Sequence, residues 1–174
     1  MSRKTPLLRL TSLVLLLGAS LAGPVNAGTP AQFIDTASAS GIAEIETSRL
    51  AIQKTTSTDI NSFAVEMIKD HTDANRDLKA IAAHHDLPMA PEAEILDRAR
   101  KLMLQVQVQE GESFDIAYVA NQIKAHEDAI QLFKDEAEHS ASPELKAFAI
   151  QTLPKLQMHL DMARKLEMSH HKGN

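Results

Sequence analysis

Three of the eight histidines in the chain have the spacing of side chains that could act together on a metal ion. His71, His126 and His159 each interrupt a series of apolar residues that recur at alternating steps of three and four, which is typical of the inward face of a helix in a bundle. An imidazole on such a face either bonds to a polar neighbour or binds a metal. If the three side chains meet at one level, they predict a site for one transition-metal ion.

Glu44 is the candidate fourth ligand, although a neighbouring stripe through Ile45 competes with it for the inward position. A carboxylate beside three imidazoles would suit Zn, Cu, Fe or Mn, because imidazole serves the borderline metals and carboxylate the harder ones. Asp70 precedes His71 and should point aside, where it could orient a neighbouring histidine. Met67 lies one turn before His71 and would favour copper as a ligand, although methionine at helical spacing usually fills a core.

The same side chains also fit a layer without a metal. Buried polar groups need hydrogen-bond partners, so Glu44 could bond to the three histidines directly. Buried polar groups fix the register of the helices in some bundles, at a cost in stability. The sequence leaves both alternatives open.

The histidines can meet only if the segments that carry them form helices with a common midpoint. Four long helices are expected over residues 30–54, 57–86, 113–139 and 143–168. Thr29 and Gln32 form a capping box ahead of the first, and Ser142 before Pro143 opens the last. The midpoints of the second, third and fourth helices lie close to the three histidines, which are therefore expected at one level of an antiparallel bundle.

The connections between these helices predict the fold class. The connection between the second and third long helices is long and carries a short amphipathic helix over residues 92–109, whereas the other two connections are short. One long crossover is typical of the ferritin-like arrangement. An aromatic content of 3% disfavours a β sandwich, because strands favour aromatic and β-branched residues. We expect an all-α, ferritin-like four-helix bundle over residues 28–168, followed by a flexible tail over 169–174.

Residues 1–27 have the pattern of a cleaved secretory signal peptide. Three basic residues flank the start of an apolar run over residues 10–22, and Val25 and Ala27 place small side chains at the cleavage positions. The run is shorter than the ~20 residues that span a bilayer, and no other segment of the sequence predicts a membrane span. We therefore expect a periplasmic or otherwise exported protein.

Composition narrows the chemistry further. The chain has a net charge of −5, and loss of residues 1–27 would remove three cations and no anion, which changes the charge to −8. A domain this acidic is not expected to bind nucleic acid, because proteins bind nucleic acids largely through contacts of basic side chains with phosphates. Because the chain has no cysteine, a transition-metal site must use histidine, carboxylate or methionine. The sequence indicates no particular protein partner and leaves a homo-oligomer open.

Several motifs carry a family resemblance: Gly41-x-x-Glu44-Ile45, Phe63-Ala64-x-x-Met67-Ile68-x-Asp70-His71, Phe114-Asp115-x-x-Tyr118, and Leu153-Pro154-x-Leu156-x-x-His159. In this order they resemble a bacterial family of exported domains of unknown function that are grouped with ferritin-like folds and often labelled outer-membrane proteins. The resemblance covers nearly all of the chain after residue 27 and implies a four-helix ferritin-like domain. It implies no activity.

The sequence departs from the di-iron proteins that share the ferritin-like fold. Those proteins use a Glu-x-x-His pair on each of two helices and a further Glu from each of the other two. The residues three positions before the histidines are here Ile68, Ile123 and Leu156. A di-iron oxidase or a ferroxidase is therefore not expected.

Two functions remain as hypotheses. In the first, the bundle holds one transition metal for sequestration, delivery or a redox step. In the second, it is a non-enzymatic structural or interaction module of the cell envelope with a metal-free polar layer. The sequence contains no nucleophile elbow, no phosphate-binding glycine loop and no His-Glu-x-x-His motif, so a hydrolytic enzyme is the least favoured interpretation. With no recognised catalytic motif, the sequence leaves open whether the protein is an enzyme.

Overall fold

The computed structural model describes residues 28–104 and 114–171, and within these ranges it is entirely helical. The helices are α1 (Pro30–Lys54), α2 (Thr58–His84), α3 (Glu92–Leu104), α4 (Phe114–His139) and α5 (Pro143–His171). The all-α expectation is confirmed. The expected signal peptide, the end of the short helix beyond residue 104, and residues 172–174 of the expected tail lie outside the described residues.

The caps read from the sequence form at both expected helix starts. The Thr29 hydroxyl accepts a bond from the Gln32 N–H at 3.2 Å, and the Gln32 side chain accepts from the Thr29 N–H at 2.9 Å. Ser142 accepts from the Leu145 N–H at 3.3 Å ahead of α5. These bonds satisfy backbone donors that have no partner inside the helix, which fixes where each helix begins.

Two helix ends differ from the expectation. α2 stops at His84, two residues early, and Asp86 then adopts a left-handed backbone with a φ of 50°. α5 continues to His171, so residues 169–171 are helical rather than part of a tail. Contacts of the last turn explain this extension, because Ser169 donates to the Leu166 carbonyl at 2.9 Å and the His170 ring lies 3.2 Å from the Asp59 carboxylate of α2.

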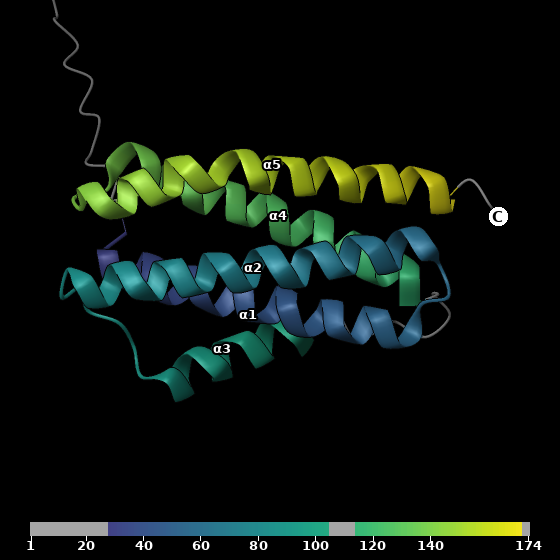
Figure 1. Cartoon of the computed structure of the whole chain (residues 1–174), viewed down its shortest axis with the longest axis horizontal. Coiled ribbons are helices and arrows are strands. Elements are labelled where there is room, and N and C mark those ends of the chain that lie inside the picture. Colours follow the sequence, from purple (N-terminus) through teal and green to yellow (C-terminus); the bar gives the residue numbers. More distant parts are fainter. Residues whose placement is uncertain (1–27, 105–113, 172–174) are drawn as a thin grey trace, which may run out of the picture.

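The four long helices lie side by side, and α3 lies against α1 outside them (Figure 1). α1 packs against α2 and α4 packs against α5, while α1 also contacts α4 and α2 contacts α5. α2 and α4 run in the same direction, so the connection that contains α3 returns along the length of the molecule (Figure 1). This arrangement surrounds a common interior with one face from each long helix.

Two apolar clusters fill this interior, one toward each end of the long helices. The first includes Phe33, Leu78, Phe133 and Leu145, and the second includes Ile60, Phe63, Tyr118 and Ala163. Six of the buried polar residues lie near the boundary between the two clusters: Glu44, Asp70, His71, Gln122, His126 and His159. Other buried polar residues, such as Asp35 and Glu136, lie closer to the helix ends. The interior therefore contains a polar level, which includes the three histidines, between two largely apolar layers.

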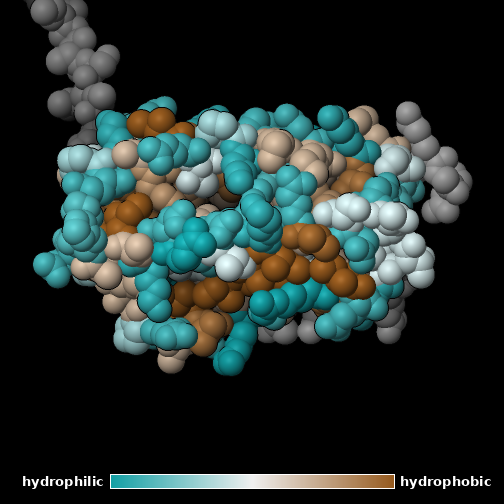
Figure 2. Space-filling model, viewed as in Figure 1, coloured by the Kyte–Doolittle hydropathy of each residue, from teal (hydrophilic) through white to brown (hydrophobic). Residues whose placement is uncertain are grey.

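The face in Figure 2 is largely hydrophilic, with its hydrophobic side chains confined to patches. Within the described part of the chain, no helix combines the length and the apolar character that crossing a membrane would need.

Candidate metal centre

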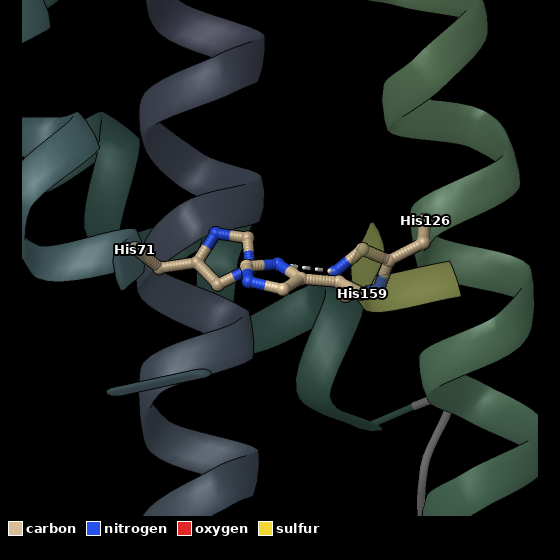
Figure 3. Close-up of side chains that lie close together, drawn as sticks. All are labelled: His71, His126 and His159. Carbon is tan, nitrogen blue, oxygen red and sulfur yellow. Dashed lines mark hydrogen bonds between the residues drawn. The ribbon is translucent and has the colours of Figure 1, made fainter. Parts of the chain in front are cut away.

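The three histidine rings meet at the polar level, one from each of α2, α4 and α5 (Figure 3). The ring centroids of His71 and His126 are 5.5 Å apart, those of His71 and His159 are 5.6 Å apart, and those of His126 and His159 are 5.3 Å apart. Each ring offers one nitrogen that lies within 4.8 Å of the nitrogens of the other two. All three side chains are buried. The structure thus brings together the histidines that the sequence spacing singled out.

The outer nitrogens of two of these rings have fixed partners. His126 Nδ1 lies 2.8 Å from the carbonyl oxygen of Gln122, and His159 Nε2 lies 3.1 Å from Asp70 Oδ2. A carbonyl and a carboxylate only accept hydrogen bonds, so each of these ring nitrogens carries a proton. The bond partners therefore assign the tautomers, with the free lone pairs on His126 Nε2 and His159 Nδ1.

Those two free nitrogens face each other at 3.3 Å. If both rings are neutral, two lone pairs point at one another, which is unfavourable unless a proton or a metal ion lies between them. Zn–N bonds of about 2.0–2.1 Å in a tetrahedral arrangement place two ligand nitrogens about 3.3–3.4 Å apart. The observed separation therefore matches that of two imidazoles on one tetrahedral ion.

Burial keeps the imidazoles neutral, which is the form that binds a metal. Loss of solvation, together with a smaller effect of the nearby histidines, lowers the pKa of His71 to about 3 and that of His126 to about 4. Burial also lowers the pKa of His159, although the bond to Asp70 opposes this shift. Each of the neutral rings of His126 and His159 already carries one proton on its outer nitrogen. A third proton, placed between their two inner nitrogens, is consequently disfavoured at neutral pH.

Asp70 is held as a carboxylate beside the site. Burial raises its pKa, but hydrogen bonds from Lys155, Lys69 and His159 outweigh this and lower the pKa below its usual value. Lys155 Nζ lies 3.0 Å and Lys69 Nζ 3.2 Å from Asp70 Oδ1. Asp70 orients His159 in the way that a carboxylate orients a metal-binding imidazole.

Glu44 lies at the same level but apart from the three nitrogens. It is buried and lines a cavity together with His71 and His126. Among the described residues it joins no group of ligand atoms within 4.8 Å of one another. Burial raises the pKa of Glu44 to about 8, an effect that Gln122 partly offsets, although no hydrogen bond of standard geometry joins the two side chains. Glu44 is therefore largely protonated at neutral pH.

Met67 is fully buried among the apolar residues of the second cluster. Its side chain packs there with Phe63, Tyr118 and Ala163. Core filling accounts for this position without a role at the metal.

Sequence reasoning missed Gln122 and Glu66. Gln122 lies one turn before His126, and its side-chain oxygen and nitrogen are buried without a hydrogen-bond partner among the described residues. Glu66 lies one turn before Asp70 and forms a second group with Asp70 and His159 whose ligand atoms are within 4.8 Å of one another. In both cases the sequence offered one signal: each residue lies four positions before a candidate site residue and therefore on the same face of its helix. The two lysines on Asp70 disfavour a cation in the second group.

A model of the protein family described as a domain of unknown function, DUF4142, matches residues 18–166 of the chain. No curated protein and no solved structure matches it. The matched range includes all three histidines together with Glu44 and Asp70. Because the family has no known function, the chemistry of these buried groups is inferred from their geometry. The three histidines could hold a metal ion.

Proposed function

The chain belongs to the DUF4142 family of domains of unknown function, and we propose that it binds one transition-metal ion between His71, His126 and His159. The observation that carries the proposal is the 3.3 Å approach of two ring nitrogens whose protons are held on the opposite side of each ring. A metal ion removes the repulsion between the two lone pairs and uses both of them. His71 supplies the third nitrogen from α2.

The donor set narrows the choice of metal. Three imidazoles suit Zn, Cu and Fe, and the spacing of the nitrogens favours a tetrahedral ion. Mn fits less well, because it prefers carboxylates and Glu44 lies outside the group of nitrogens. Asp70 and the Gln122 carbonyl keep the ligand nitrogens of His159 and His126 free of protons.

We infer that the setting is an exported ferritin-like bundle. The parallel course of α2 and α4, with α3 in the connection between them, supports the ferritin-like topology (Figure 1). The basic and apolar pattern of residues 1–27 supports a signal peptide and a periplasmic or otherwise exported location. Metal sequestration, delivery or a redox step outside the cytoplasm would each fit such a bundle.

One observation favours a second candidate, a structural or interaction module of the cell envelope without a metal. The Asp70 carboxylate 3.1 Å from His159 would stabilise a cationic imidazole, and that third proton could join His159 to His126. The polar level would then act only to set the register of the helices. Against this candidate, burial lowers the pKa of His159 and so disfavours its protonated, cationic form.

Metal content of the purified protein distinguishes the two candidates. The chain is purified without chelator, supplied in turn with Zn²⁺, Cu²⁺ and Fe²⁺, and analysed by mass spectrometry for the amount of metal retained. We expect one equivalent in the parent and little in His71→Ala, His126→Ala or His159→Ala. His139→Ala is the matched control, because His139 lies exposed on the same helix as His126. Less than half an equivalent in the parent, or retention in all three variants, would refute metal binding here.

A further inference from the structure

A cavity of about 40 Å³ adjoins the histidines. His71, His126 and Glu44 line it together with the polar residues Ser40 and Asn75, and much of the remaining wall is apolar, from alanine, leucine and phenylalanine side chains. One water needs roughly 10–15 Å³ on this measure, so the cavity has room for a molecule of a few heavy atoms. An entirely apolar cavity would stay free of water, but this wall carries polar groups that can bind a polar molecule.

One oxygen in this wall lacks a partner. Glu44 Oε2 is buried and has no hydrogen-bond partner among the described residues. Leaving a buried carboxyl oxygen unpaired is unfavourable, because it loses its bonds to water and gains none in return. A polar molecule in the cavity would satisfy it. The same Glu44 is too far from the group of three nitrogens to complete a ligand set with them.

A second cavity lies beside the first. It measures about 90 Å³ and shares Ser40, Glu44 and Ala125 with the first. Lys124 and Asp128, whose side chains are exposed, form part of its lining. Glu44 therefore lies where the two cavities meet, and residues of both α1 and α4 line this junction.

From these three observations, and resting on the proposed metal site, we infer that the ion takes its fourth ligand from solution and that the cavity beside His71 and His126 is where this ligand binds. The ligand class is a small inorganic nitrogen or oxygen donor that coordinates the ion through one atom and hydrogen-bonds to Glu44 through another. Three protein ligands with an open fourth position are typical of reactive metal sites, whereas structural sites are closed. The site is therefore built for exchange of small molecules at the metal.

Azide and the cobalt form of the protein test this inference. Co²⁺ replaces Zn²⁺ in tetrahedral sites, and its visible absorption changes when a ligand is exchanged. Titration of the cobalt-loaded chain with azide should give a saturable spectral change. Ala125→Leu narrows the junction of the two cavities and should abolish the change. Glu44→Leu removes the hydrogen bond and should weaken azide binding by about tenfold. Glu46→Leu, on the same helix but outside both cavities, should behave as the parent.

Each outcome is informative. Far-UV circular dichroism and cobalt stoichiometry establish that a variant is folded and loaded, and Glu44→Leu provides the test if Ala125→Leu does not fold. A parent that binds cobalt but shows no response to azide has a closed site, which overturns the inference while metal binding stands. An azide response that is unchanged in both cavity variants places the ligand elsewhere and also overturns it. A parent that binds no cobalt refutes the metal site itself.

Discussion

His126 Nε2 and His159 Nδ1 lie 3.3 Å apart in the core, and the opposite nitrogen of each ring donates to an acceptor that cannot donate back. The Gln122 carbonyl and the Asp70 carboxylate thereby hold both protons away from the shared space. Whatever joins the two inner nitrogens must be a cation. A proton and a metal ion differ in their response to pH and to added metal, so solution measurements separate them.

Added Zn²⁺ should stabilise the metal-free parent against heat. A ligand that binds only the folded state contributes about 2.7 kcal/mol when its free concentration is a hundred times its Kd. For a chain of this size each kcal/mol raises Tm by about 2–4 °C, so we expect an increase of roughly 5–10 °C by differential scanning calorimetry. His126→Ala should show no such increase. An equal increase in the parent and this variant would indicate binding at other sites.

Asp70→Asn should weaken the binding of Zn²⁺ without removing a ligand. The asparagine keeps the size of the side chain but lacks the charge that holds the proton of His159 on Nε2. Loss of such an orienting carboxylate typically costs 10–100-fold in metal affinity, which competition with a chromophoric chelator can measure. Asp73→Asn is the matched control, because Asp73 also pairs with Lys69 but is more exposed. Equal affinities in the two variants would contradict the role of Asp70.

Much of this site could be predicted from local sequence patterns. The caps at Thr29 and Ser142 depend only on neighbouring residues, and both form as expected. The rise per residue of an α-helix is constant, so equal distances from the helix ends were enough to place His71, His126 and His159 at one level. The three rings do meet there.

Contacts between helices were harder to predict, because the rotation of each helix about its axis depends on packing. Two stripes competed on α1, and the structure buries both Glu44 and Ile45. The sequence therefore could not say whether the carboxyl group would reach the histidines or stop in the adjoining cavity. The lysine on α5 that holds Asp70 has no local signal either, because Lys155 meets Asp70 only in the folded chain.

Gly41 and Asn75 should be energetically coupled. A Cβ at Gly41 would lie 2.5 Å from the Asn75 side-chain oxygen, so Gly41→Ala must displace the amide that donates to the Ser38 carbonyl. In the parent we expect this clash to cancel the gain of up to about 1 kcal/mol that alanine brings to a helix interior. In Asn75→Ala the same change should recover that gain. Urea unfolding of the four proteins in this cycle measures the coupling, and additive effects would exclude it.

The metal-free protein should be most stable near neutral or slightly acidic pH. Burial lowers the pKa of His71 from 6.5 to about 3 and that of His126 to about 4, so between these values and 6.5 the unfolded chain binds more protons and stability falls as the pH falls. Burial raises the pKa of Glu44 from 4.5 to about 8, so the folded chain binds the extra proton in that window and stability falls as the pH rises through it. Below pH 6.5 the histidines outweigh the single glutamate.

Glu44→Gln separates the two effects. Glutamine keeps a neutral side chain of similar size, so the decline in unfolding free energy between about pH 6.5 and 8 should disappear while the decline below pH 6.5 stays. Urea unfolding monitored by circular dichroism at several pH values gives both limbs. Glu46→Gln, a less buried neighbour on α1, should leave the curve of the parent unchanged. If the decline in stability above pH 6.5 persists in Glu44→Gln, Glu44 is not a protonated acid in the folded protein. It could then not donate a hydrogen bond to a ligand of the metal.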